Sequence, residues 1–196
     1  MEAREHVLAR AMTRPVNRGL GAGRNELLRT ARGEYAFMLD ADNSIYPAAI
    51  ERLSDALDAD PTAAFAYCML ERYDSRRSLG LLSEGPWEPE RLRHGNYVDA
   101  MAMLRRAEVL ALGGYCEDIR LYGWEDFDLW CRIAERGGHG VLVPEILCRY
   151  RQSRHSMLSL SAIDGTDAVS LLRDRYPSVW PGVPHGVHSD VPALPD

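Results

Sequence analysis

The sequence contains no lysine, because its 23 basic residues are all arginine. This absence excludes Schiff-base enzymes, P-loop nucleotide-binding proteins and protein kinases, since each of them needs a catalytic or phosphate-binding lysine. A formal charge of -6 and an isoelectric point near 5.5 leave no basic excess. A nucleic-acid-binding domain normally concentrates such an excess on one face, so nucleic acid is not an expected partner.

Two further patterns are missing. The four cysteines form no C-x-x-C pair, which favours reduced thiols in a core over a zinc site. No run reaches the roughly 18 apolar residues of a membrane span, and the first eleven residues lack the apolar region of a signal peptide. We therefore expect a cytoplasmic protein, with peripheral attachment to the inner face of the membrane allowed.

The chain is long and apolar enough for one domain, with 196 residues of which 46% are hydrophobic. We expect this domain to cover residues 1–176, and the proline- and glycine-rich residues 177–196 to form a disordered tail. Periodicity and turn residues predict alternating helices and strands, and hence an α/β fold. The predicted helices are 2–12, 24–31, 47–60, a short one before Gly113, 124–136 and 168–175; the predicted strands are 34–39, 63–70, 96–104 and 141–150.

The strongest candidate for metal chemistry is the pair Asp40 and Asp42, directly after the predicted strand 34–39. Ligands of open α/β sheets gather at the carboxyl ends of strands, and two carboxylates there suit a hard divalent cation. A polar turn that begins the next helix is the simple alternative. An EF-hand loop would need glycine where Ile45 stands, and a phosphatase of the aspartyl-phosphate type would need threonine at Ser44; we regard both as unlikely matches.

A second candidate is the segment Gly123-Trp124-Glu125-Asp126, at the start of a predicted helix. Carboxylates at a helix N-terminus are held anionic by the free N–H groups, which orients them and lowers their basicity. Capping of the helix is the simple alternative. Three acids in one turn beside a tryptophan exceed what capping needs, and an aromatic platform next to a carboxylate base suits a sugar acceptor.

Two weaker candidates contain arginine. Arg151, with His155 shortly after it, follows the predicted strand 141–150, and these side chains can bind phosphate oxygens or, for the histidine, a metal. The glycine-rich stretch that ends in Arg24 opens a predicted helix as a phosphate-binding loop does, but it lacks the dinucleotide spacing.

Taken in order, these segments resemble the GT-A-fold glycosyltransferases of family 2 over about residues 15–160. The resemblance implies a Rossmann-like three-layer α/β/α domain with a mostly parallel sheet. Only sixteen residues precede the first match, so the strands that bind the nucleobase in this family are missing and the domain is expected to be N-terminally truncated. The matching segments are Asn17-Arg-Gly-Leu-Gly-Ala-Gly-Arg-Asn25, Tyr35-Ala-Phe-Met-Leu-Asp-Ala-Asp42, Tyr122-Gly-Trp-Glu-Asp-Phe-Asp-Leu-Trp-Cys-Arg132 and Tyr150-Arg-x-x-x-x-Ser156-Met157.

The resemblance also implies an inverting sugar transfer from a nucleoside-diphosphate sugar, of the UDP or GDP type, to a saccharide or lipid-linked acceptor. Asp126 would be the general base, and Trp124 with Glu125 would bind the acceptor. Asp40 and Asp42 would hold Mn²⁺ or Mg²⁺, with His155 as a further ligand. The residues near the nucleotide and its diphosphate would be Arg24, Asp40, Arg151 and His155.

Three alternatives remain at this stage. A catalytically inactive remnant that serves as a binding module would keep the same segments without the chemistry. Metal-dependent nucleotidyl transfer would use the aspartate pair but would give no role to the acidic helix start. A homodimer is one of the assemblies that could complete the sheet, and without completion we expect weak donor binding.

Overall fold

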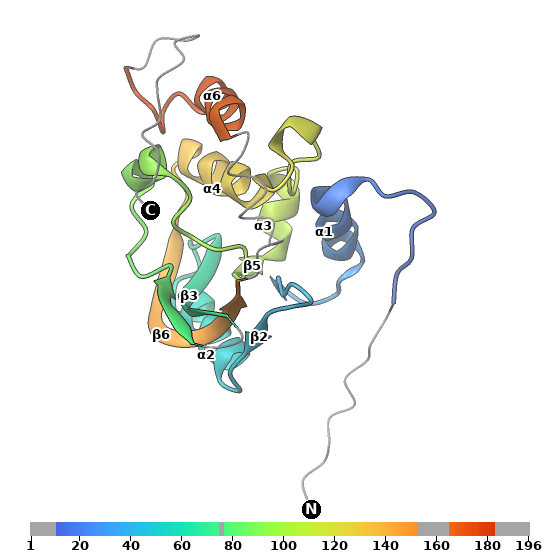
Figure 1. The fold of residues 1–196 in the computed structure, drawn as a ribbon, viewed down its shortest axis with the longest axis vertical. Helices are drawn as coiled ribbons and strands as arrows, with labels where there is room; N and C mark the ends of the chain where they lie inside the picture. Colours follow the sequence, from blue (N-terminus) through green and yellow to red (C-terminus); the bar gives the residue numbers. More distant parts are fainter. Residues whose placement is uncertain (1–10, 75–76, 153–164, 183–196) are drawn as a thin grey trace, which may run out of the picture.

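A computed structural model describes residues 11–74, 77–152 and 165–182 of the chain. Figure 1 shows one sheet with α2 on one side and α3, α4 and α6 on the other. The helices are α1 (Gly19–Thr30), α2 (Ala49–Ala59), α3 (Arg106–Ala111), α4 (Glu125–Glu135) and α6 (Gly165–Arg175), with 3₁₀ turns η1 (Pro89–His94) and η2 (Ile119–Leu121). The strands are β1 (Tyr35–Phe37), β2 (Ser44–Ile45), β3 (Phe65–Tyr73), β4 (Ser78–Leu82), β5 (Met103–Arg105) and β6 (Gly140–Arg151).

The sheet has the order β1-β5-β3-β6-β2, and β4 pairs with the end of β3. Within the described residues, β3 and β6 are the one parallel pair and the other four pairings are antiparallel, which corrects the prediction of a mostly parallel sheet. Because β5 is antiparallel to both β1 and β3, the strands β1, β3 and β6 all run in one direction. Their carboxyl ends therefore meet at one edge of the sheet, as the α/β prediction required.

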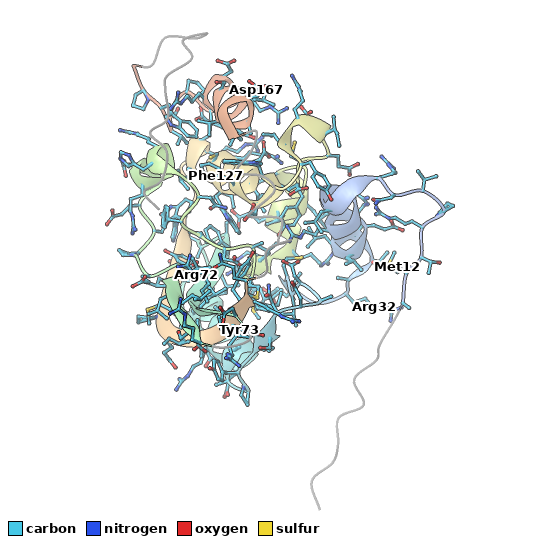
Figure 2. The ribbon with its side chains drawn as sticks, viewed as in Figure 1. Met12, Arg32, Arg72, Tyr73, Phe127 and Asp167 are labelled. Carbon is cyan, nitrogen blue, oxygen red and sulfur yellow. The ribbon has the colours of Figure 1, made fainter. Side chains whose placement is uncertain are left out.

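Strand β3 separates two cores. Its side chains alternate between the faces of the sheet, as in any extended strand. Phe65 and Tyr67 pack with α4 and α6, whereas Ala66 and Cys68 pack with Leu53 and other residues of α2. Figure 2 shows the side chain of Phe127, on α4, between α6 and the sheet. The domain thus has the three layers that the sequence predicted.

Helix α1 begins earlier than predicted. The sequence indicated a glycine-rich turn up to Gly23, but the helix starts at Gly19 and includes these glycines. Gly21 has a packing reason, because a β-carbon there would lie 2.1 Å from the carbonyl oxygen of Cys116. The missing side chain therefore lets α1 approach the loop after α3 closely.

Asn25 fastens α1 to the same loop. Its side-chain amide donates to the carbonyl oxygen of Tyr115 at 2.8 Å and its Oδ1 accepts from the N–H of Tyr115 at 2.7 Å. Gly114, with φ of +74°, leaves room for this amide. The last residue of the glycine-rich motif thus has a structural role, and it fixes the orientation of its neighbour Arg24.

Several other predictions have clear outcomes. The helices at 47–60 and 124–136 and the strands at 63–70 and 141–150 are confirmed within a few residues as α2, α4, β3 and β6. The predicted strand 96–104 is mostly wrong, because only β5 is extended and paired. The predicted tail begins too early, since Val179 and Trp180 are buried and belong to the core above the sheet. The predicted helix 2–12 and the rest of the tail fall almost entirely outside the described residues.

All four cysteines lie in the described part of the chain and none forms a disulfide, as predicted. Cys68 and Cys148 are buried on neighbouring strands, with their sulfur atoms 3.5 Å apart. Among the described residues, no helix combines the length and apolar character that crossing a bilayer requires.

Candidate active site

The turn after β1 places Asp40 opposite Arg24 of helix α1. The Nη2 atom of Arg24 donates to Oδ1 of Asp40 at 3.1 Å. The arginine side chain is 8% exposed and the aspartate side chain is 40% exposed, so the pair is covered on one side and open on the other. The guanidinium also lies over the ring of Tyr115, 5.2 Å from its centroid. Two residues predicted near a nucleotide are therefore in contact, although 16 positions separate them.

Asp42 lies in the same turn, with its side chain exposed. The neighbouring Asn43 accepts a hydrogen bond from the backbone N–H of Arg151 at 2.9 Å, so the end of β6 lies beside the aspartate pair. Arg151 thus lies at the end of β6 beside Asn43, its role at a diphosphate stays a prediction, and His155 lies outside the described residues.

The turn with Asp40 and Asp42 is the candidate site for a divalent cation. Asp40 and Asp42 supply carboxylate oxygens, which hard cations prefer, and Mg²⁺ normally keeps several water ligands besides one or two carboxylates. Within the described ranges, no group of three or more acidic, histidine or cysteine side chains is arranged around a common point. The donor set therefore fits a cation held by few protein ligands, and Mn²⁺ or Mg²⁺ stays a prediction.

Asp126 lies in the first turn of α4, half-buried. Its Oδ2 accepts a hydrogen bond from Nδ2 of Asn96 at 2.9 Å. Burial raises the pKa of Asp126 above the usual aspartate value, although Arg24, the N–H of Phe127 and Asn96 lower it. The sequence had suggested a lowered basicity from the helix terminus, and this was wrong because desolvation outweighs the helix N–H groups.

The two neighbours of Asp126 differ in exposure. Trp124 is half-buried and packs its ring against Phe127, with centroids 5.8 Å apart. Glu125 is 3% exposed and approaches Gly21 of α1, and its burial raises its pKa. Trp124 can still offer part of its ring to an acceptor, whereas Glu125 lies against α1. The acceptor roles of both residues stay predictions.

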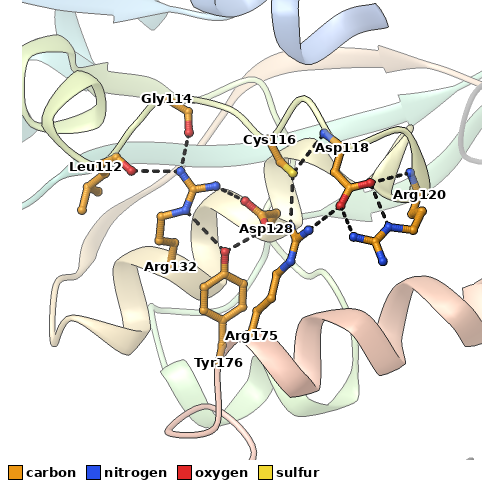
Figure 3. Close-up of polar contacts among 9 residues, drawn as sticks. All are labelled: Leu112, Gly114, Cys116, Asp118, Arg120, Asp128, Arg132, Arg175 and Tyr176. Carbon is orange, nitrogen blue, oxygen red and sulfur yellow. Dashed lines mark hydrogen bonds and ion pairs between the residues drawn. The ribbon is translucent and has the colours of Figure 1, made fainter.

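The third acid of this turn, Asp128, belongs to a buried network that ties α6 to α4 (Figure 3). Its side chain is 0% exposed and contacts Arg132 and Arg175 as ion pairs and the hydroxyl of Tyr176, which donates to it at 2.8 Å. Arg175 also contacts Asp118 at the start of η2. Asp128 is therefore structural, and the network connects the first turn of α4 to α6.

Sequence analysis missed two polar residues at this site, Asn96 and Asp99. Both precede β5. Because β5 is antiparallel to β1, the residues before β5 lie at the same edge of the sheet as Asp40, which follows β1. Asp99 is close enough to Asp126, Asp40 and Arg24 for their charges to act on it, and burial raises its pKa to about 7. The sequence offered one indication of this role, the acidic Asp99 shortly after Gly95-Asn96. Because residues 96–104 were predicted to form a strand, that indication was overlooked.

A groove of about 1250 Å³ lies between α1 and the end of β1. Arg24 and Asp40 line it together with Tyr122, and its other walls are largely apolar, including the half-exposed Leu27 and Leu39. Asp40 thus borders a space large enough for a small-molecule ligand. The arrangement combines an open aspartate turn, an arginine and a carboxylate, Asp126, that is hydrogen-bonded to Asn96, has a raised pKa and lies within reach of the charge of Arg24.

The chain resembles known proteins in sequence and in fold. Residues 3–111 match the sequence profile described as glycosyl transferase family 2. A protein of Haemophilus influenzae described as an uncharacterized glycosyltransferase is 22% identical over 170 residues, which are 82% of this chain and 56% of that protein. The chain thus spans about half the length of the curated relative that it matches.

Solved structures share the fold. The crystal structure of S. aureus TarS 1–349 in complex with UDP-GlcNAc has a TM-score of 0.63 and 12% identity, over 82% of this chain and 46% of that one. The same fragment in complex with UDP has a TM-score of 0.56 and 14% identity, over 82% and 52%. At these identities the likeness establishes the architecture alone.

Proposed function

Because the chain belongs to glycosyl transferase family 2, we propose that it carries the metal- and acceptor-binding part of an inverting glycosyltransferase. The reaction would move a sugar from a nucleoside diphosphate to a hydroxyl group of an acceptor. The observation that carries this proposal is the carboxylate of Asp126, which accepts a hydrogen bond from Asn96 and whose pKa is raised by burial, within reach of the charge of Arg24, which itself bonds Asp40.

In this mechanism Asp126 accepts the proton of the acceptor hydroxyl. The acceptor oxygen forms a bond to the anomeric carbon of the sugar, and the bond from that carbon to the diphosphate oxygen breaks on the opposite face. A raised pKa suits this role, since a general base works best when its pKa approaches the working pH. Asn96 keeps the carboxylate turned toward one position during the transfer.

The leaving diphosphate carries negative charge that must be neutralised. Asp40 and Asp42 would hold Mn²⁺ or Mg²⁺, which when bound supplies that neutralisation. Arg24 and Arg151 would bind phosphate oxygens directly, with His155 as a further contact. Trp124 would offer its ring to a saccharide or lipid-linked acceptor, and Glu125 would support it.

The donor is proposed to be a UDP-sugar, with a GDP-sugar as the second choice. The support is the likeness to S. aureus TarS, which was crystallised with UDP-GlcNAc and with UDP. Arg24 and Asp40 also line a groove of about 1250 Å³, which is large enough for a small-molecule ligand.

Replacement of Asp126 by asparagine tests the function. The assay measures release of UDP from millimolar UDP-GlcNAc with Mn²⁺, in the presence of a panel of small saccharide acceptors. Asp126→Asn should lower the rate by at least about 100-fold, as expected for loss of a general base. Asp55→Asn is the matched control, because Asp55 is exposed on α2.

Circular dichroism must show that both variants keep their fold. Transfer that survives Asp126→Asn in a folded protein would contradict the role of Asp126 as the base, and folded wild-type protein that shows no transfer would favour the catalytically inactive binding module.

A further inference from the structure

Tyr115 contacts two consecutive residues of α1, Arg24 and Asn25. The side-chain amide of Asn25 donates to the carbonyl oxygen of Tyr115 at 2.8 Å and accepts from its N–H at 2.7 Å. The guanidinium of Arg24 lies over the ring of Tyr115, with its Cζ atom 5.2 Å from the ring centroid. Asn25 therefore fixes the backbone of Tyr115, and the ring of Tyr115 supports the side chain next to Asn25.

Two glycines allow α1 and the loop after α3 to approach closely enough for these contacts. Gly114 has a φ of +74°, and a β-carbon there would lie 2.3 Å from Oδ1 of Asn25. A β-carbon at Gly21 would lie 2.1 Å from the carbonyl oxygen of Cys116. A side chain at either position would push the helix and the loop apart, so the close contact depends on both glycines.

The ring of Tyr115 is a rigid support, because the core holds it. Tyr115 is 2% exposed and belongs to the same core cluster as Phe127 and Trp130. Side chains in such a packed interior have little room to move. The hydroxyl of Tyr115 has no hydrogen-bond partner among the described residues. The contact with Arg24 is therefore made by the ring.

Arg24 has few other contacts that fix its guanidinium. Among the described residues, the guanidinium makes one hydrogen bond, from Nη2 to Oδ1 of Asp40 at 3.1 Å. The carboxylate of Asp40 is 40% exposed and is also the predicted cation ligand, so it is shared and cannot fix the guanidinium alone. Stacking on a ring leaves the N–H groups of an arginine free for phosphate oxygens.

We propose that Tyr115 is a positioning residue of the donor site, whose ring holds the guanidinium of Arg24 ready for the diphosphate. This inference rests on the proposed function, in which Arg24 binds phosphate oxygens. A cation over an aromatic face is attracted by the ring, and the attraction is stronger where water is excluded, as it is around this pair. The diphosphate then binds to an arginine that is already ordered.

Binding of UDP to the full chain tests this role, with Mg²⁺ present and saturation-transfer NMR as the readout. Tyr115→Phe keeps the ring, whereas Tyr115→Met fills the core with a flexible side chain that has no ring. The dissociation constant of UDP should stay within about twofold in Tyr115→Phe. It should rise about tenfold in Tyr115→Met, because a freed arginine side chain must be ordered when UDP binds. Asp55→Asn, on the exposed surface of α2, is the control and should leave it unchanged.

A double-mutant cycle distinguishes positioning from a merely structural role. Arg24→Met should weaken UDP binding at least as much as Tyr115→Met. Adding Tyr115→Met to Arg24→Met should weaken it no further, because Tyr115 acts through Arg24. A structural role would give the same loss in both backgrounds. Circular dichroism melts establish that each variant is folded.

Several outcomes would overturn the role of Tyr115 and leave the donor proposal intact. These are additive losses in the cycle, normal UDP binding by folded Tyr115→Met while Arg24→Met binds weakly, and a loss in Tyr115→Phe as large as that in Tyr115→Met.

If Tyr115→Met does not fold, the wild-type chain decides. Nuclear Overhauser contacts between the ring protons of Tyr115 and the side chain of Arg24 should persist at saturating UDP, and their loss would overturn the proposal. Wild-type protein that does not bind UDP, or Arg24→Met that binds it normally, would overturn the proposed donor site together with this inference.

Discussion

Replacing Asp128 by asparagine should destabilise the domain strongly. The carboxylate has no exposed surface, and its oxygens contact Arg132, Arg175 at 3.2 Å and the hydroxyl of Tyr176 at 2.8 Å. The variant leaves two largely buried guanidinium groups without their shared counter-charge. Removing one partner of a buried ion pair costs about 3–5 kcal/mol.

We expect the lower end of that range, because asparagine can still accept one hydrogen bond and Arg132 keeps its bonds to the carbonyl oxygens of Leu112 and Gly114, at 3.0 and 2.7 Å. For a chain of this length, a loss of about 3 kcal/mol lowers the melting temperature by roughly 6–12 °C. Urea unfolding followed by circular dichroism gives the free energy of unfolding directly.

Two further variants complete the test. Asp55→Asn, on an exposed helix surface, should change the free energy of unfolding by less than about 0.5 kcal/mol. Combining Asp128→Asn with Arg175→Met should cost less than the sum of the two single changes, since the second removes one unpaired cation. A loss below about 1 kcal/mol for Asp128→Asn, or strict additivity, would refute the account of a coupled buried network.

Two predictions concern pH. Burial raises the pKa of Asp99 to about 7 from its ordinary value of 3.8, so the stability of the folded state falls as pH rises between these two values. Asp99→Asn should therefore be more stable than wild type at pH 8, by roughly 2 kcal/mol after allowance for partial exposure. It should bring no gain at pH 3, and thermal melts at both pH values check this. The hydrogen bonds from His139 and Thr62 lower the pKa of Asp60 to about 2, so the stability that they contribute is present above pH 4 and is lost as pH falls toward 2. Asp60→Asn should be less stable than wild type at neutral pH, and equal melting temperatures of the two proteins at pH 6 would contradict this.

The main candidates were predictable because their positions follow from local rules. Asp40 follows a short apolar strand, and Asp126 opens an amphipathic helix that ends at Gly137-Gly138, so the sequence places both carboxylates at the ends of elements. The parallel direction of β1, β3 and β6 then brings Asp40 and Arg151 to one edge. That inference needed only the alternation of strands and helices.

Other features could not be predicted in this way. Asp128 looked like a third acid of the site, but α6, which is 40 residues further along the chain, buries it. Asn96 and Asp99 looked like strand residues, and only the antiparallel insertion of β5 between β1 and β3 makes them face the site. The glycines of α1 looked like a turn, yet they lie in the helix, and the close approach of Cys116 gives a packing reason for Gly21.

By itself, the sequence determined the α/β class, the positions of α2, α4, β3 and β6 within a few residues, and the aspartates that follow β1 and begin α4, because these depend on periodicity and capping among near neighbours. The tertiary structure alone decided the strand order, the pairing of Arg24 with Asp40, the structural role of Asp128 and the position of Asn96 and Asp99 at the edge of the sheet. These depend on register and burial between distant segments, which hydrophobic patterns leave open. The raised pKa values of Asp99, Glu125 and Asp126 follow from that burial, so they too depend on the tertiary structure.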